Sequence, residues 1–308
     1  MFLGDKSPLR LALNAASPFG PLLPGAHIST YSSNDPKSWP VVMEALDFEA
    51  PGPSLLTDQT ERIGASIALK LFLGLTDCHH ENMHHGERDS LLYFCSMDWE
   101  TVLCELSHPH ESGLFRMKRK CACPGNYCQS YGLKKFSGVI NPAQVIAGHM
   151  SMMKALGSQL GPLNDLLKTE LRQRLFHRRL VLRDTLEYGR ALQTKDWTDY
   201  LPEEIAQLER GEIPYFFHVY GQSEMLYWKA PDSMAVVNAS PPNWYRSPMD
   251  QFSVPAQLFH DGLLAIARSL DPATPVANFS FGKFRVSYRP NLVLVDAPAG
   301  RFFEKRFT

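Results

Sequence analysis

Two short segments of the chain carry the residue types that phosphoryl transfer requires. Residues 76–82 read TDCHHEN, and residues 97–101 (MDWET) follow an apolar, strand-like run at 91–96. Transfer of a phosphoryl group to a hydroxyl needs a group that orients or deprotonates the nucleophile. It also needs oxygen ligands for the magnesium ion that neutralises the phosphates. The two segments therefore predict a phosphotransferase.

The predicted roles follow from the side-chain types. Asp77 and His79 form the candidate catalytic pair: Asp77 polarises the acceptor hydroxyl or supports His79, which lies near the transferred phosphate. Asn82 and Asp98 are predicted to bind magnesium, and hence the nucleotide, because hard oxygen donors suit that ion. Glu100 is either a further ligand or a carboxylate that orients the ligands. An isolated Asp-x-His triplet is more often an ordinary turn, but the Asn and second Asp at this spacing favour function.

Four motifs, in order, resemble the dehydratase domain of class II lanthipeptide synthetases, which is built like a lipid kinase. The two segments above are similar to its catalytic and metal-binding loops. Residues 177–188 (HRRLVLRDTLEY) resemble its Arg-rich strand that ends in Thr and Tyr, and residues 211–216 (GEIPYF) resemble its Gly-Asp-Ile-Pro-Tyr-Phe signature. The resemblance extends over most of the chain.

The resemblance implies a role in lanthipeptide biosynthesis: phosphorylation of Ser or Thr in a ribosomally made precursor peptide, with ATP and Mg²⁺, then phosphate elimination to a dehydroamino acid. In the family, an Arg and a Thr six positions apart assist elimination, and Arg179 and Thr185 have that spacing. With Arg183 they form a second candidate constellation. A guanidinium can hold phosphate oxygens bidentately while a hydroxyl hydrogen-bonds the leaving group. The alternative is a solvated basic strand.

The N-terminal part departs from the family where ATP is anchored. Residues 4–7 (GDKS) match only part of the family's Gly-Asp-Ser-His segment, its Lys-Pro-Arg strand has no counterpart, and no cyclase domain follows. The lysines before the catalytic loop are Lys6, Lys37 and Lys70. We therefore expect a short, stand-alone dehydratase with a separate cyclase as partner. Three alternatives remain open: a kinase that stops at the phosphorylated peptide or small alcohol, an inactive kinase-like binding or scaffold protein, and an enzyme whose missing N-lobe elements come from a partner chain.

The cysteines raise a separate question. Three of them lie close together: Cys121, Cys123 and Cys128. With His108 or His110 they would supply the four N/S ligands of a structural zinc site, although the spacing is not that of a standard finger. The alternative is a loop of reduced thiols. The other three occupy core-like or motif positions rather than a disulfide framework: Cys78, Cys95 and Cys104.

Composition narrows the partners and the compartment. The net charge of −1 and the pI near 6.8 give no general attraction to nucleic acid or to anionic membranes. The chain lacks a run of about twenty apolar residues, and residues 1–8 do not resemble a secretory signal. We expect a cytoplasmic protein with neither a nucleic-acid nor a membrane partner.

The expected fold is α+β and two-lobed, like the atypical kinases, with the active site in the cleft between lobes. A small mixed N-lobe is predicted at 1–53 and a mainly helical C-lobe at 54–308, with the Pro/Gly-rich residues 50–54 as hinge. A helix beginning at Thr57 or Asp58 should carry Ile63, Ile67 and Leu71 on its core face. Further helices are expected at 141–156, 160–176, 202–210 and 256–270. Strands are expected at 9–13, 41–43, 91–96, 179–182, 284–288 and 292–295.

Overall fold

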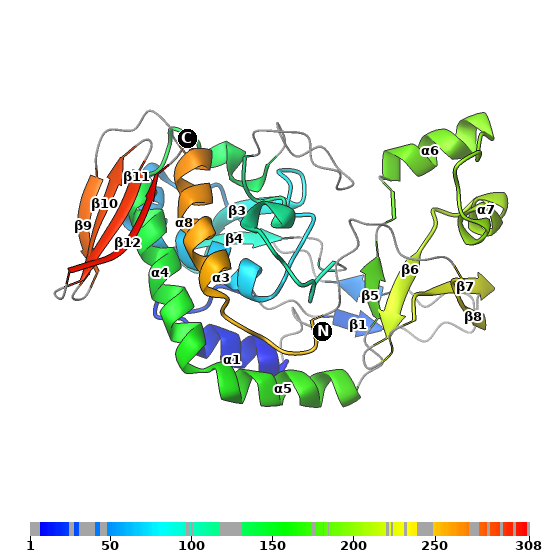
Figure 1. Ribbon diagram of the computed structural model, residues 1–308, viewed down its shortest axis with the longest axis horizontal. Coiled ribbons are helices and arrows are strands. Elements are labelled where there is room, and N and C mark those ends of the chain that lie inside the picture. Colours follow the sequence, from blue (N-terminus) through cyan, green and yellow to red (C-terminus); the bar gives the residue numbers. More distant parts are fainter. Residues whose placement is uncertain are drawn as a thin grey trace.

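The structure, a computed structural model, describes most of the chain. The described residues are 7–24, 28–30, 41–43, 48–96, 99, 101–116, 131–173, 177–180, 182–183, 185–219, 222, 224–230, 233–238, 249–270, 277–281, 284–289, 292–297 and 300–306. They form an α+β protein, as predicted (Figure 1). The predicted division into kinase-like lobes at residue 53 stays a prediction.

The helices agree closely with the sequence-based expectations. They run Pro8–Ala16 (α1), Pro53–Asp58 (α2), Thr60–Phe72 (α3), Pro142–Ser158 (α4), Leu160–Gln173 (α5), Thr185–Thr194 (α6), Pro202–Glu209 (α7) and Ala256–Leu270 (α8). Short 3₁₀ helices occupy Pro109–Ser112 (η1) and Gly132–Phe136 (η2). The helices expected at 141–156, 202–210 and 256–270 are confirmed, and the one expected at 160–176 is confirmed as far as it is described. Within the described ranges, no helix has the length and apolar character needed to cross a membrane.

The strands pair in antiparallel sheets. They run Ile28–Thr30 (β1), Val41–Met43 (β2), Met83–Arg88 (β3), Leu91–Ser96 (β4), His177–Leu180 (β5), Phe216–Val219 (β6), Leu226–Ala230 (β7), Ser233–Val236 (β8), Ala277–Phe281 (β9), Phe284–Arg289 (β10), Leu292–Ala297 (β11) and Gly300–Arg306 (β12). β1 pairs with β2, β3 with β4, and the other two sheets are ordered β5-β6-β7-β8 and β12-β11-β10-β9. The strands expected at 41–43, 91–96, 284–288 and 292–295 are confirmed, and β5 overlaps the one expected at 179–182.

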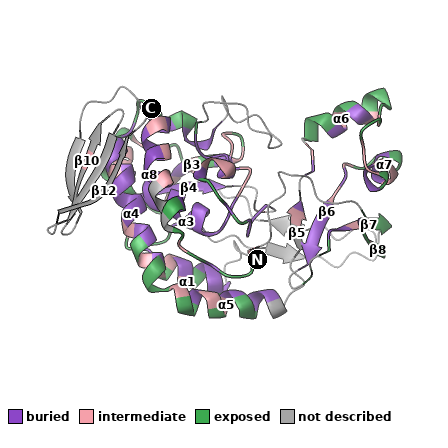
Figure 2. Ribbon diagram, viewed as in Figure 1, coloured by how far each residue is buried: buried purple, intermediate pink, exposed green. Residues whose placement is uncertain are grey.

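Helix α3 crosses the middle of the largest apolar core. Its predicted core residues Ile63, Ile67 and Leu71 are at most 2% exposed. Helices α1, α4, α5 and α8 and the β3–β4 hairpin supply side chains to the same core, and Figure 2 shows their buried faces turned toward one another. The segment that leaves α3 therefore starts from the centre of the largest apolar core.

Helices α3 and α4 cross backbone to backbone at two glycines. A Cβ atom added to Gly64 would lie 1.8 Å from the carbonyl oxygen of Val145, and one added to Gly148 would lie 1.9 Å from that of Glu61. Such separations are far below van der Waals contact, so neither position accepts any side chain without moving a helix.

Two local predictions about the N-terminal part were wrong. Residues 9–13 form part of helix α1 rather than a strand, because Pro8 suits the first helical turn and the Ser7 hydroxyl caps it by accepting from Arg10 N at 3.3 Å. Leu9 and Leu13 of this helix pack into the main core, while Leu11 is exposed. Thr57 does not cap α3 but lies in the last turn of α2, where its hydroxyl donates to Pro53 O at 3.0 Å. Asp58 ends α2 as well, and Gln59 precedes α3.

A second unit of packing lies to one side of the main core in Figure 1. It comprises the β5–β8 sheet with helices α6 and α7, and it buries three small apolar clusters of its own. Strands β5 and β6 pair in the register Leu180 to Phe216. This pairing brings the two motif segments 177–188 and 211–216 side by side, although residues 189–210 separate them in the chain.

Candidate functional site

The loop that carries Asp77 is fixed by backbone hydrogen bonds to the chain on both sides of it. Thr76 N donates to Thr101 O at 3.0 Å, and the Thr101 hydroxyl returns a bond to Thr76 O at 3.1 Å. Cys78 N donates to Ser112 O at 2.8 Å. At the start of the loop Gly74 has φ +59, and an added Cβ would lie 2.2 Å from a backbone oxygen, so only glycine fits there. These contacts hold the 74–82 loop against residues 101–104 and η1.

Asp77 is held in a strained conformation by Asn82. Its φ of 58° lies in the left-handed region, which costs a non-glycine residue about 1 kcal/mol or more. The Asn82 amide compensates, because Nδ2 donates to the Asp77 backbone oxygen at 3.0 Å and to its Oδ2 at 3.1 Å. The Asp77 carboxylate remains 32% exposed. Backbone strain of this kind is concentrated at functional sites, where it aims a side chain.

His79 is oriented by the same loop. Its Nδ1 accepts a hydrogen bond from Glu81 N at 3.3 Å, which places the proton of the neutral ring on Nε2. Nε2 faces the Asp77 carboxylate, 3.8 Å from Oδ1, which is an ion-pair separation rather than a hydrogen bond. The predicted catalytic residues Asp77 and His79 and the predicted ligand Asn82 are therefore neighbours in one loop.

The fit to magnesium can be tested in part. Because Asn82 uses Nδ2 on Asp77, its Oδ1 remains as an oxygen ligand, and it accepts no hydrogen bond within the described part of the chain. The predicted ligands Asp98 and Glu100 lie outside the described residues. The flanking backbone is described: Ser96 is paired with Met83, the residue after Asn82, and Thr101 is bonded to the loop at Thr76. The one predicted ligand that is described, Asn82, thus offers an oxygen of the kind that a hard divalent cation takes.

The candidate zinc ligands Cys121, Cys123 and Cys128 also lie outside the described residues. Of the two candidate histidines, His110 lies in η1 and His108 directly precedes it, and their rings stack with centroids 5.3 Å apart. Over the ranges that are described, His, Cys, Asp and Glu side chains nowhere gather in threes as a metal site. The remaining cysteines are buried, as expected for core positions: Cys78, Cys95 and Cys104.

The second constellation is spread along β5 and the start of α6. Arg179 lies in β5 opposite Phe217, with its guanidinium carbon 5.3 Å from the centre of the Tyr215 ring. Thr185 is the first residue of α6 and is exposed. Arg183 occupies the turn between them. The structure thus places all three predicted residues within one strand, turn and helix, with Tyr215 of the 211–216 segment beside Arg179.

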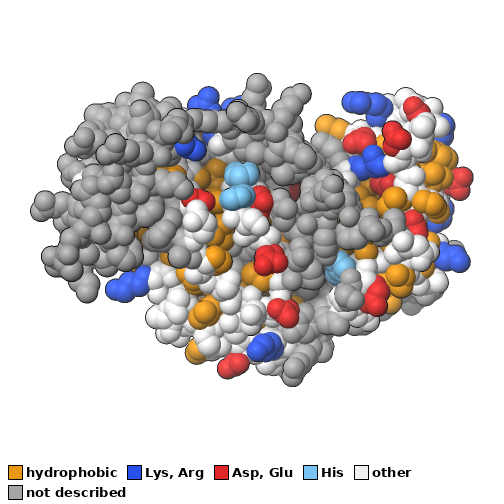
Figure 3. Space-filling view, in the orientation of Figure 1, with side chains coloured by type: hydrophobic (Ala, Val, Ile, Leu, Met, Phe, Trp, Pro, Cys, Tyr) orange, Lys and Arg blue, Asp and Glu red, His pale blue; other side chains and the backbone are white. Residues whose placement is uncertain are grey.

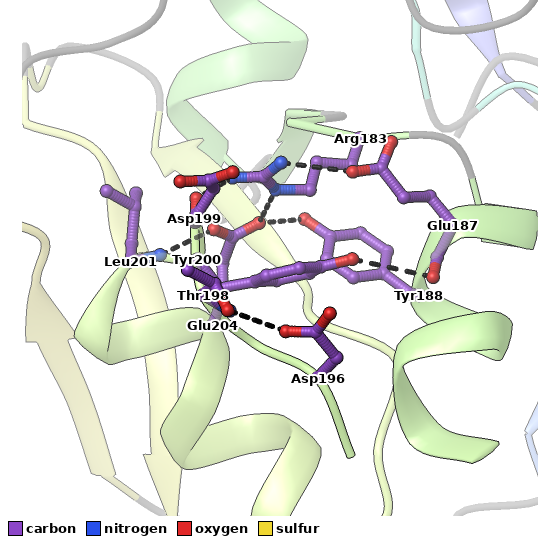
Figure 4. A network of polar contacts seen from close by, with 9 residues as sticks. All are labelled: Arg183, Glu187, Tyr188, Asp196, Thr198, Asp199, Tyr200, Leu201 and Glu204. Carbon is purple, nitrogen blue, oxygen red and sulfur yellow. Dashed lines mark hydrogen bonds and ion pairs between the residues drawn. The ribbon is translucent and has the colours of Figure 1, made fainter. Parts of the chain in front are cut away.

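Arg183 is engaged by its neighbours on every side (Figure 4). Its Nε donates to Glu204 Oε1 at 3.0 Å, and one terminal nitrogen donates to Glu187 Oε1 at 3.0 Å. The other bonds the Asp199 carbonyl, and the guanidinium lies 4.2 Å from the centre of the Tyr200 ring. Burial acts to lower the pKa of Arg183, but the two carboxylates outweigh it and the pKa is raised. Arg183 is therefore permanently charged and already bound.

Sequence reasoning missed the residue at the centre of this network. Glu204 is 1% exposed, and its carboxylate also accepts from Tyr188 Oη at 2.5 Å and from Leu201 N at 2.8 Å. Burial, together with the Glu204 charge, raises the pKa of Tyr188 far above its ordinary value. The only signal in the sequence was the position of Glu204 in the first turn of a helix that begins with Pro202, where a carboxylate commonly reaches back to the N-cap amide.

Sequence reasoning also left Lys70 unexplained. Its side chain is 1% exposed, and its Nζ donates to Phe94 O and to Ser66 Oγ, each at 2.6 Å. Burial lowers its pKa. Lys70 therefore ties α3 to the end of β4, from which the chain continues toward Asp98.

Comparison with known proteins adds no family to this description. No protein-family model matches the chain. A search of curated proteins also finds no match. The motif resemblance and the geometry of the two constellations are therefore the observations that bear on function.

Proposed function

We propose that this protein phosphorylates Ser or Thr in a ribosomally made precursor peptide with ATP and Mg²⁺, and then eliminates the phosphate to leave a dehydroamino acid. The observation that carries the proposal is the strained Asp77, held by the Asn82 amide in a loop built on the main core. Asp89 in the β3–β4 turn has a similar φ of 53°, so the double hydrogen bond from Asn82, rather than the backbone angle, distinguishes Asp77. The restraint supports a carboxylate that must be aimed.

In the first step the chain's own residues orient the acceptor and take its proton. The hydroxyl oxygen of the peptide attacks the γ-phosphorus of ATP, the bond from that phosphorus to the bridging oxygen breaks, and ADP leaves. Asp77 orients the hydroxyl and accepts its proton. His79, whose Nε2 lies 3.8 Å from Asp77 Oδ1, would lie near the transferred phosphate and interact with the Asp77 carboxylate.

Asn82 Oδ1 and Asp98 would hold the magnesium ion, with Glu100 as a further ligand or an orienting carboxylate. When bound, the ion neutralises charge on the phosphates. Chain connectivity supports this set. Asp98 lies two residues after Ser96, which is paired beside Asn82, and three residues before Thr101, which is bonded to the loop.

In the second step the phosphate becomes the leaving group. A proton leaves the α-carbon, its electron pair forms the double bond to the β-carbon, and the bond from that carbon to the phosphate oxygen breaks. Arg179 would hold the departing oxygens and Thr185 would hydrogen-bond them. Both come from one strand-turn-helix element, which supports a joint role. The base that takes the proton is assigned to none of the described residues.

A second candidate function, an inactive binding or scaffold protein, is favoured by one observation. Lys70 is buried and bonded to Phe94 O and Ser66 Oγ, so it does not serve as the lysine that anchors ATP phosphates. Lys6 and Lys37 lie outside the described residues. An ATP anchor is therefore the missing part of the catalytic proposal, and nucleotide binding is the property to measure first.

The test is calorimetric titration of the protein with ATP, with and without Mg²⁺. Magnesium-dependent binding that Asp98→Asn abolishes is expected, since that change removes a charged ligand. The matched control is Asp89→Asn, because Asp89 lies at the far turn of the same β3–β4 hairpin with its side chain 84% exposed. Mass spectrometry of precursor peptides would then show gain of phosphate and loss of water. Absence of ATP binding would overturn the catalytic proposal and favour the scaffold.

A further inference from the structure

We propose that Glu204 and Tyr188 are positioning residues for the elimination step: they hold Arg183, and through it they fix Thr185 relative to Arg179. This inference rests on the proposed function and assigns a task within it. It also changes the expected role of Arg183 from contact with the phosphate to support of the residues that make that contact.

Glu204 accepts hydrogen bonds from donors on separate elements of the second unit. Its carboxylate, almost completely buried on α7, accepts from Arg183 in the β5–α6 turn, from Tyr188 on α6 and from the backbone of Leu201 (Figure 4). A buried charge is tolerated only where such partners are complete. Glu204 therefore locks the β5–α6 turn, α6 and α7 to one another.

Most of the N–H groups of Arg183 already have acceptors and cannot also bind a phosphate. Its three nitrogens donate to two carboxylates and one carbonyl, and the Tyr200 ring covers one face of the guanidinium. Two N–H groups remain, one on each terminal nitrogen, and a phosphate that approached them would face the negative charges of Glu204 and Glu187. Positioning requires no such approach.

The network holds in place the turn between Arg179 and Thr185. Arg183 precedes the first residue of α6, Thr185, by two positions and follows Arg179 by four. Arg179 is fixed separately, by β5–β6 pairing and by the Tyr215 ring. The distance and angle between the two proposed elimination residues therefore depend on the turn that Arg183 clamps.

The cost of burying a carboxylate does not by itself explain why Glu204 has so many partners. Glu203, the neighbouring carboxylate on α7, is also buried, yet only one of its oxygens has a described partner, Asn238 N at 3.2 Å. Its position stabilises α7 without reaching the β5–α6 turn. Glu203 thus provides a control of the same residue type, helix and burial.

The experiment separates elimination from phosphorylation by supplying the intermediate. Synthetic peptides that contain phosphoserine or phosphothreonine are incubated with the protein, Mg²⁺ and ADP, and loss of phosphate is followed by mass spectrometry. The same peptides without phosphate, together with ATP, report phosphorylation. The variants are Glu204→Gln, which removes the charge, Tyr188→Phe, which removes only the hydroxyl, and Glu203→Gln as control.

Glu204→Gln is expected to slow elimination by up to about a hundredfold, the cost of misplacing a reacting group by about 1 Å, through kcat rather than KM. Tyr188→Phe should act in the same direction but less strongly. Neither should change phosphorylation, so phosphorylated peptide accumulates, and Glu203→Gln should change neither rate.

Three results would overturn the proposal. Unchanged elimination in Tyr188→Phe and Glu204→Gln would remove the positioning role. A parallel fall of both rates, or an equal fall in Glu203→Gln, would show a purely structural role. Absence of elimination by the unaltered protein would refute the inference, whereas absence of phosphorylation with elimination intact would refute only the kinase step. If Glu204→Gln does not fold, Tyr188→Phe decides.

Discussion

The two constellations are supported in opposite ways. The Asp77 loop leaves a helix in the centre of the largest core and is held mainly by backbone hydrogen bonds to residues 101–104 and η1. The Arg179–Thr185 element stands on small apolar clusters and is held by side-chain charges gathered on Glu204. Backbone bonds survive most substitutions, whereas a side-chain network depends on each member. The Asp77 loop should therefore tolerate most single substitutions, whereas the Arg179–Thr185 element should be sensitive to the loss of one side chain.

Figure 3 shows acidic and basic side chains together on the described part of one face of the molecule. The net charge of −1 gives the chain no overall attraction to a polyanion. Under the proposed function, a peptide would be selected by short-range contacts near the two constellations.

The largest expected effect is on the core beneath the Asp77 loop. Gly64→Ala should lower the free energy of unfolding by about 3 kcal/mol or more, because the new methyl group would lie 1.8 Å from Val145 O and would force α3 and α4 apart. Urea unfolding measures this. The control is Gly157→Ala on α4, where nothing lies within 4 Å and replacement by Ala should stabilise the helix by up to about 1 kcal/mol.

The same variant tests whether the two regions depend on each other. Elimination from a phosphorylated peptide that survives in Gly64→Ala, while phosphorylation is lost, would show that the second unit folds without the first. Equal unfolding by Gly64→Ala and Gly157→Ala would contradict the close crossing of the helices.

The next effect is on catalysis without loss of fold. Asp77→Asn should lower the rate of phosphorylation by about 10²- to 10⁴-fold, the range for removal of a general base, and should leave urea unfolding almost unchanged. Asp89→Asn is the control, since Asp89 lies at the turn of the β3–β4 hairpin with its side chain 84% exposed. Turnover by Asp77→Asn at the unaltered rate would refute the assignment of Asp77.

A smaller effect concerns pH and the buried thiol under the loop. Burial raises the pKa of Cys95 from its ordinary 9.0 to about 11, although Lys70 and Arg62 lower it in part. The unfolded chain therefore releases this proton first as pH rises. The contribution of the Cys95 thiol to the free energy of unfolding is fully present below pH 9 and is lost as pH rises toward 11. The loss is at most about 3 kcal/mol, because each pKa unit corresponds to about 1.4 kcal/mol.

Denaturant unfolding at the two ends of this range would measure the effect. Cys95→Val and Cys95→Ser lack the titrating group, so both should lose less stability than the unaltered protein over the interval, whatever their starting stability. An equal loss in all three would show that Cys95 does not carry the pH dependence.

The sequence predicted the elements with strong local signals and missed those that depend on distant partners. Helix α8 was predicted to the residue because its apolar side chains recur at helical spacing, and β4 because it is a short apolar run. Helix α1 was mistaken for a strand, because Leu-x-Leu-x-Leu also alternates and the capping hydroxyl of Ser7 was overlooked. The Gly64 crossing leaves no mark in a single sequence.

The candidate sites divide in the same manner. Asp77, His79 and Asn82 were found together because they lie within six residues, and the bonds between them are local. Glu204 was missed because its partners Tyr188 and Arg183 lie 16 and 21 residues away in the chain. Only tertiary packing identifies such a residue.

The smallest effect separates the buried network from an ion pair beside it. Arg210 and Glu212 approach to 2.6 Å, and the hydrogen bond from Arg210 raises the pKa of the arginine, but both side chains are largely in solvent. Exposed pairs contribute about 0–1 kcal/mol, so Glu212→Gln should change the free energy of unfolding by less than about 0.5 kcal/mol and leave elimination intact. Arg210 would keep its bonds to Ala206 O and Trp228 O, each at 3.0 Å, which is a further reason for a small effect. Urea unfolding and the phosphopeptide assay measure both quantities. A larger loss of stability or of elimination in Glu212→Gln would extend the sensitive network to the surface of the second unit. No change in Glu212→Gln, beside a strong effect of Glu204→Gln, would confine the network to the buried Glu204 carboxylate and its donors.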